Sequence, residues 1–168
     1  MKIIFFDPGG VTGWATFSAR EVEGPDGIEY YNMEFAIGQI EHPDHHTTIE
    51  RLIGIQHSDF DYTVGFERWH LQKKDDGSER EGLDFMAPEY IGAIKLASAL
   101  RPGPLNLVSQ MPHERKFADK RKMEIFNLWS LTNGRKDARA AAQHLLTYLI
   151  KTMEYPPIMR QLQLGLLV

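Results

Sequence analysis

The hydrophobic positions of this chain begin with an unbroken run at residues 3–6, which predicts a strand buried on both faces. Pro8-Gly9-Gly10 follows and predicts a tight turn. Residues 11–17 then return as a second strand, in which Gly13 lets backbone or a ligand approach closely. Residues 30–40 are rich in aromatic and β-branched side chains and predict a third strand. The chain therefore opens with a predicted antiparallel meander.

Turn residues and charges mark the connections that follow. Pro25-Asp26-Gly27 gives residues 18–29 the pattern of a hairpin tip. The histidines at positions 42, 45 and 46 favour a solvated loop before a helix, with a metal cluster as the alternative. Two further strands are predicted at residues 61–69 and 105–110, and the polar stretch 72–82 between them is typical of a mobile loop.

Hydrophobic residues at helical spacing predict helices between and after these strands. Thr47 or Thr48 is expected to cap the first helix, and Pro88 suits the first turn of the second. The expected fold is one α/β domain, residues 1–155, in which a mixed five-stranded sheet is flanked by helices, and residues 156–168 form a tail that packs on the domain or on a partner. The expected helices cover residues 47–58, 88–100, 123–131 and 137–153, with Thr132-Asn133-Gly134 breaking the third.

Composition narrows the classes of function. The 168 residues have ordinary globular usage and contain no cysteine, which excludes disulfides, thiolate zinc sites and a cysteine nucleophile. A net charge of −4 argues against a globally basic nucleic-acid binder but leaves room for a local basic face. No membrane-length apolar run exists, and Asp7 interrupts the N-terminal run, so neither a signal peptide nor a membrane span is predicted. We expect a soluble, cytoplasmic protein.

Three acids stand at the ends of predicted elements: Asp7, Glu67 and Asp137. A right-handed crossover would make the first and fourth strands neighbours, with their carboxyl ends side by side. Three close carboxylates repel one another and favour Mg²⁺ or Mn²⁺, and two such ions suit phosphoryl chemistry. Each acid also has a structural alternative, as a turn cap, a salt-bridge partner or a helix N-terminal acid. His144 is expected to make a polar core contact or a DNA contact, because it lies too far along the helix to share an ion with Asp137.

Four segments resemble RuvC-like Holliday-junction resolvases, a family of the ribonuclease H-like superfamily. Residues 7–14 resemble the family's DPG-x-x-x-TG opening with one residue fewer, and residues 64–67 resemble its second acidic strand. Residues 117–123 are similar to its G-x-A-x-K-x-x-V segment, and residues 137–142 resemble its final acidic helix. Gly134 stands where the family carries a further acid or histidine, and Phe117 replaces its glycine. The chain's size and short loops resemble those of bacteriophage members.

The resemblance implies a ribonuclease H-like fold and a metal-dependent endodeoxyribonuclease that cuts four-way or other branched DNA junctions, in the host cytoplasm if phage-encoded. It implies two Mg²⁺ or Mn²⁺ ions held by the three acids, Lys120 at the position of the active-site lysine, and a homodimer, which we place on the helix at residues 88–100. Trp69 or His70 is expected to stack on an unpaired base. The alternatives are a junction-binding protein without catalysis, which Gly134 keeps open, and an RNA-processing nuclease of the same superfamily. The expected DNA contacts are Arg68, Trp69, His70, Lys73, Lys74, Arg115, Lys116, Arg121 and Lys122.

Overall fold

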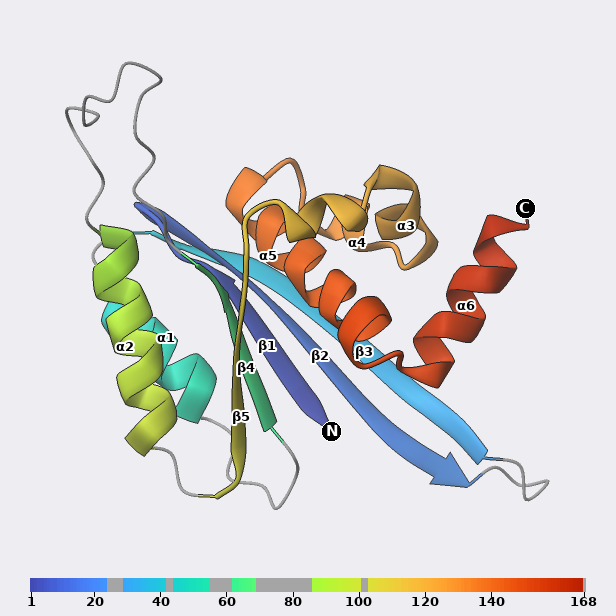
Figure 1. Cartoon of the computed structure of the whole chain (residues 1–168), viewed down its shortest axis with the longest axis horizontal. Coiled ribbons are helices and arrows are strands. Elements are labelled where there is room, and N and C mark those ends of the chain that lie inside the picture. Colours follow the sequence, from blue (N-terminus) through green and yellow to red (C-terminus); the bar gives the residue numbers. More distant parts are fainter. Residues whose placement is uncertain (24–28, 42–43, 55–61, 69–85, 101–102, 168) are drawn as a thin grey trace.

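A five-stranded mixed sheet forms the centre of the protein, with strand order β3-β2-β1-β4-β5 (Figure 1). The structure is a computed structural model that describes residues 1–23, 29–41, 44–54, 62–68, 86–100 and 103–167. Its strands are β1 (Lys2–Asp7), β2 (Val11–Glu23), β3 (Glu29–Glu41), β4 (Tyr62–Glu67) and β5 (Leu105–Gln110). Its helical elements are α1 (His45–Gly54), α2 (Met86–Leu100), η1 (Glu114–Phe117), α3 (Lys120–Ile125), α4 (Leu128–Leu131), α5 (Lys136–Thr147), η2 (Tyr148–Thr152) and α6 (Pro156–Leu166).

The strand directions confirm the predicted α/β sheet. β1, β2 and β3 form an antiparallel meander, and β4 runs parallel to both β1 and β5. The pairing of β1 with β4 is in register up to Phe6 and Phe66, so the acids that follow these two residues leave the sheet at the same edge. That edge carries the candidate site.

The first strand is buried on both faces, as its apolar run predicts. Ile3 and Phe5 enter a core that the sheet shares with α3, α5 and α6. Ile4 and Phe6 enter a second core, which the sheet shares with α1 and α2. Figure 1 shows these two helical layers on opposite faces of the sheet. In the described ranges, no helix combines the length and the apolar character needed to cross a bilayer.

The N-terminal half differs from the prediction at two places. β2 continues to Glu23 and β3 begins at Glu29, so most of the expected hairpin tip is paired strand; the turn itself lies outside the described residues. α1 begins at His45, because the Asp44 carbonyl accepts the first helical hydrogen bond from the Thr48 amide at 2.9 Å. Thr47 and Thr48 are therefore interior helical residues rather than caps.

The histidines expected in a loop lie partly inside this helix. His45 is buried and its ring stacks on Tyr90 of α2, with ring centroids 4.1 Å apart. His46 lies 2.9 Å from the Glu89 carboxylate, also on α2. These contacts join α1 to α2, so the solvated-loop interpretation is wrong for His45 and His46. His42 lies outside the described residues.

The predicted single helix at residues 123–131 is two helices. Asp119 caps α3 by accepting the Lys122 amide at 3.0 Å, and the helix ends at Ile125. Asn127 adopts a left-handed conformation, φ 56°, which turns the chain before α4 begins. The predicted break after α4 is confirmed, because Asn133 and Gly134 also have positive φ values. The C-terminal tail forms α6, whose Ile158 and Leu162 are buried in the same core as α3 and α5.

Candidate active site

Two acids meet at the carboxyl ends of neighbouring parallel strands. Asp7 is the last residue of β1 and Glu67 is the last residue of β4. Both side chains are mostly buried, with 14% of Asp7 and 17% of Glu67 exposed. Such an edge is where open α/β sheets place their ligands. The predicted convergence of the first two acids is present in the structure.

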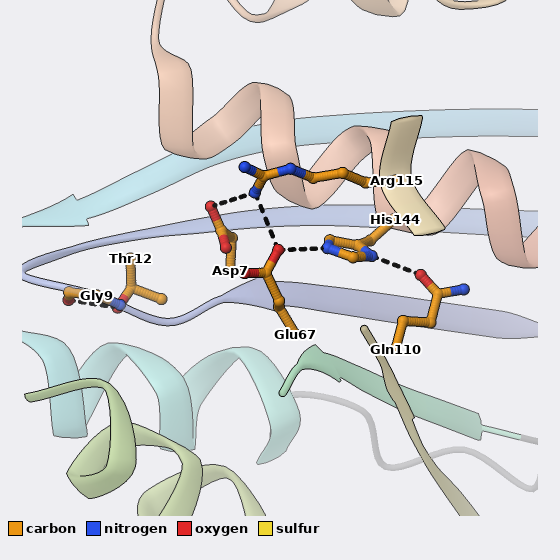
Figure 2. Close-up of polar contacts among 7 residues, drawn as sticks. All are labelled: Asp7, Gly9, Thr12, Glu67, Gln110, Arg115 and His144. Carbon is orange, nitrogen blue, oxygen red and sulfur yellow. Dashed lines mark hydrogen bonds and ion pairs between the residues drawn. The ribbon is translucent and has the colours of Figure 1, made fainter. Parts of the chain in front are cut away.

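One arginine joins the two carboxylates (Figure 2). Nη1 of Arg115 lies 2.9 Å from Glu67 Oε2 and 3.7 Å from Asp7 Oδ2. Arg115 belongs to η1, the short turn that follows β5, so the chain returns to the acid pair immediately after the last strand. The sequence predicts Arg115 as a DNA contact and gives no sign of this pairing, because the acids lie far from it along the chain.

The third acid approaches because of a glycine. Gly13 of β2 lies opposite Asp7 of β1 in the antiparallel pairing. A Cβ atom at Gly13 would lie 1.9 Å from the backbone oxygen of Asp137, far inside contact distance. The absence of a side chain therefore lets the first turn of α5 rest on β2 beside Asp7. The close approach that Gly13 predicts is confirmed, and the approaching group is the backbone that carries Asp137.

A threonine closes the turn beneath these residues. The hydroxyl of Thr12 donates to the Gly9 carbonyl at 3.2 Å, and the same hydroxyl oxygen accepts the Gly9 amide at 3.4 Å (Figure 2). Thr12 is fully buried. These bonds fix the connection between β1 and β2, so the Asp7 backbone has little freedom. The carboxyl of Asp7 faces Arg115 and is not the cap of its own turn in this arrangement.

Burial and the neighbouring acids disfavour the ionised form of Asp7. Burial is the main cause that raises its pKa from an ordinary 3.8 to about 7, and the carboxylates of Glu67 and Asp137 add to the rise. The guanidinium of Arg115 opposes it. When both carboxylates in contact with Arg115 are ionised, they carry more negative charge than its single guanidinium neutralises, a situation that favours a bound cation.

Glu67 is held from its other side by a buried histidine. Nε2 of His144 lies 2.7 Å from Glu67 Oε2, and Nδ1 lies 2.6 Å from Gln110 Oε1 (Figure 2). His144 is fully buried on α5, and Gln110 is buried at the end of β5. The expected polar core contact of His144 is confirmed. That its partner is Glu67 does not follow from the sequence, since the two residues are on elements far apart in the chain.

The predicted active-site lysine lies on another helix. Lys120 is the first residue of α3, its side chain is 63% exposed, and its Nζ lies 3.6 Å from Glu124. The same amine lies 5.6 Å from the centre of the Trp129 ring. The cation in contact with the acid pair is Arg115 instead. Lys120 remains a candidate for contact with a substrate that extends along the helical layer.

Four of the other eight predicted DNA contacts lie in the described residues. Lys116 and Arg121 are exposed, and Arg121 donates to the Leu166 carbonyl at 3.1 Å. Lys122 forms an ion pair with Asp119 at 2.6 Å. Nε of Arg68 donates to the Ser109 hydroxyl at 2.8 Å, beside Glu67. The remaining four lie outside the described residues: Trp69, His70, Lys73 and Lys74.

The carboxylates of the site are suitable ligands for a divalent cation, but few of them converge on one point. In the ranges that the structure describes, no three Asp, Glu or His side chains are grouped closely enough to hold a metal ion. Two carboxylates do converge on one positively charged nitrogen, and oxygen ligands of this kind favour Mg²⁺ or Mn²⁺. Asp137 lies near enough to raise the pKa of Asp7. Gly134, at the family's further ligand position, is exposed and offers no side chain.

No protein-family model matches the chain, and no curated protein matches it. The function therefore rests on the sequence motifs and on the geometry of the acid pair.

Proposed function

We propose that this chain is a divalent-cation-dependent endonuclease of the ribonuclease H-like superfamily that cuts branched DNA, in the manner of RuvC-like resolvases. The observation that carries the proposal is the convergence of Asp7 and Glu67 on a single positive charge, with Asp137 beside them. A buried group of carboxylates with unneutralised charge is costly unless a cation binds there. Phosphodiester hydrolysis is a reaction that uses such a site.

The sheet supports the superfamily part of the proposal. An antiparallel meander followed by two parallel strands is the arrangement that the resemblance implies, and the structure has these strand directions. The two strand-borne acids lie on the neighbouring parallel strands, and the third acid lies in the first turn of α5. The motif positions and the geometry agree for the two strand-borne acids, and Asp137 lies near enough to raise the pKa of Asp7.

The charge distribution supports a nucleic-acid substrate. Residues 103–167 carry ten Lys and Arg against five Asp and Glu, a net charge of +5, whereas the whole chain carries −4. Apart from β5, these residues form the helical layer on one face of the sheet (Figure 1), and Arg115 of this layer contacts both acids. A basic layer beside an acidic site is expected where a DNA backbone must be brought to cation ligands.

In the proposed reaction, water attacks a backbone phosphorus atom and the bridging oxygen leaves. A bound Mg²⁺ or Mn²⁺ would supply positive charge for the oxygens that develop negative charge. Asp7, Glu67 and Asp137 would hold the cation, and His144 with Gln110 would fix the Glu67 carboxylate. Lys120 and the exposed cations of the helical layer would bind the phosphates on either side.

The decisive experiment incubates the protein with an end-labelled four-way junction and Mg²⁺ or Mn²⁺. We expect symmetric nicks in the junction and none in a linear duplex of the same sequence. Glu67→Gln should lose cutting by at least about 100-fold and keep junction binding, because removal of one carboxylate charge from a crowded acidic site does not threaten folding. Normal cutting by Glu67→Gln would contradict the assignment.

A catalytically inactive junction-binding protein is the second candidate, and one observation favours it. Arg115 already provides positive charge to both acids without any metal ion. In the same assay this candidate predicts tight binding to the junction, in Mg²⁺ or Mn²⁺, without nicks. Cleavage of a structured RNA in place of the junction would instead indicate the RNA-processing alternative.

A further inference from the structure

The contact between Arg115 and the acid pair occupies the position that the proposed function gives to a divalent cation. A single nitrogen, Nη1, lies within ion-pair distance of both carboxylates, at 2.9 Å and 3.7 Å. A divalent cation bound by Asp7 and Glu67 would lie within a few ångströms of this nitrogen. Two positive charges that close repel each other strongly in a partly buried site. The guanidinium and the cation cannot both hold the acid pair in this geometry.

The backbone that carries Arg115 is fixed, whereas its side chain is long and 34% exposed. The Arg115 carbonyl accepts the Ala118 amide at 3.1 Å, and the Ala118 carbonyl accepts Nε2 of Gln143 from α5 at 2.9 Å. The Glu114 carboxylate accepts the Met111 amide at the start of the turn. The guanidinium can therefore leave the acids by rotation of its side chain while η1 stays in place.

DNA offers the displaced guanidinium a better partner. A phosphate has two oxygens in a geometry that matches the guanidinium fork, and such bidentate pairs are among the strongest charged hydrogen bonds. Arg115 lies in the basic helical layer, between β5 and the start of α3. A backbone phosphate brought to the acid pair would lie within reach of its side chain.

We propose that Arg115 is an internal counter-ion that occupies the cation site in the free protein and moves to a DNA phosphate when a divalent cation binds. This inference rests on the proposed function of the acid pair as a cation site. It adds a regulatory consequence: in free protein Arg115 weakens cation binding, and with DNA present cation and DNA each strengthen binding of the other.

The first test measures Mn²⁺ affinity without DNA, by the electron paramagnetic resonance signal of free Mn²⁺. Arg115→Gln removes the charge and keeps much of the side-chain length, and Arg115→Ala is a second neutral variant should the first fold poorly. Both should bind Mn²⁺ at least about tenfold more tightly than the wild type, because the competing charge is gone. Arg115→Lys should stay close to the wild type. The matched control is Arg51→Ala, which removes an exposed charge of α1 and should leave Mn²⁺ affinity unchanged.

The second test measures junction binding by fluorescence anisotropy in EDTA and in Ca²⁺, which supports binding with little hydrolysis. The wild type and Arg51→Ala should both bind the junction more tightly in Ca²⁺ than in EDTA, and this gain should exceed the gain of a linear duplex. Arg115→Gln should lose most of that additional gain, because it has no guanidinium to transfer.

The outcomes separate this inference from the proposed function. If both neutral variants bind Mn²⁺ no more tightly than the wild type does, the counter-ion role is overturned. The same holds if none of the proteins binds Mn²⁺. If the wild type also cuts junctions, the nuclease proposal stands without it. Tighter Mn²⁺ binding by the neutral variants, together with no cutting by any protein, supports the counter-ion role and rejects the nuclease.

Discussion

At the scale of single residues, the surroundings of Asp7 set its charge state. Burial and the neighbouring acids raise its pKa from an ordinary 3.8 to about 7, so the folded protein binds this proton more tightly than the unfolded chain does. The contribution to stability is complete below about pH 4 and is lost as the pH rises through about 7. The difference between the two pKa values corresponds to about 4 kcal/mol.

Asp7→Asn should remove this dependence. In EDTA, the free energy of unfolding of the wild type should fall between pH 5 and pH 8 more steeply than that of the variant, and the variant should be the more stable protein at pH 8. Urea unfolding followed by tryptophan fluorescence at both pH values measures the difference. Parallel pH profiles for the two proteins would show that Asp7 does not titrate in this range.

The sequence predicts which acids form the site but not which residues pair with them. Asp7, Glu67 and Asp137 could be identified because each stands at the end of a predictable element, and the crossover rule makes the strands neighbours. Arg115 and His144 could not be matched to their partners, because these contacts depend on how η1 and α5 pack over the strand ends. Arg115 and His144 are 48 and 77 positions from Glu67 in the sequence, so only the tertiary structure determines that they pair with it.

At the scale of elements, the position of α5 depends on one glycine. Gly13→Ala would place a methyl group against the Asp137 carbonyl, and backbone atoms cannot move aside as a flexible side chain can. We expect a loss of about 1–3 kcal/mol in unfolding free energy and a loss of cutting greater than this destabilisation explains, since Asp137 moves away from Asp7. Gly92→Ala is the control, because a Cβ there meets no atom within 4 Å.

The control should behave in the opposite way. Gly92 is exposed in the interior of α2, where alanine is the better helix former by about 1 kcal/mol. Gly92→Ala should therefore match or exceed wild-type stability. Wild-type cutting by Gly13→Ala would mean that the contact between β2 and α5 does not position the site.

The sequence predicts the bounds of some strands and helices correctly and those of others incorrectly, and each case has a physical reason. β5 and the end of α2 have their predicted bounds, because proline and glycine next to them interrupt the pattern. The break between α3 and α4 was missed, since the apolar spacing continues through Asn127 and only its left-handed backbone separates the helices. The sequence predicts the end of the second strand at residue 17, whereas β2 continues to Glu23, because exposed polar residues such as Arg20 and Glu21 are typical of a loop.

At the scale of the whole molecule, α2 is the predicted surface for a homodimer. Its Leu96 and Leu100 are 60% and 75% exposed, beside a shallow groove that also includes Ala93 and Ala97. Two equal cuts in a two-fold symmetric junction need two equal sites, which a two-fold dimer supplies. Light scattering at micromolar concentration should give twice the 19.3 kDa monomer mass.

The matched variants for this surface are two leucines with similar exposure. Leu96→Glu should shift the protein to the monomer mass, because it places a charge in an apolar contact. Leu164→Glu changes a leucine of α6 that is 62% exposed and should leave the dimer intact. A wild-type protein that is monomeric at these concentrations would remove the prediction altogether.

The two faces of the sheet should differ in how they bind DNA. Lys116 of η1 and Lys136 of α5 are exposed cations of the basic helical layer, next to Arg115 and Asp137 respectively. Arg51 is an exposed cation of α1, on the opposite face (Figure 1). Lys116→Ala and Lys136→Ala should each weaken junction binding and reduce the slope of log affinity against log salt by about 1, as expected for one lost phosphate contact. Arg51→Ala should change neither quantity. Anisotropy titrations at several salt concentrations, in Ca²⁺ to prevent cutting, measure the junction affinity and its dependence on salt. If Arg51→Ala has as large an effect as the two lysine variants, the proposal that DNA binds on the face of the basic helical layer is wrong.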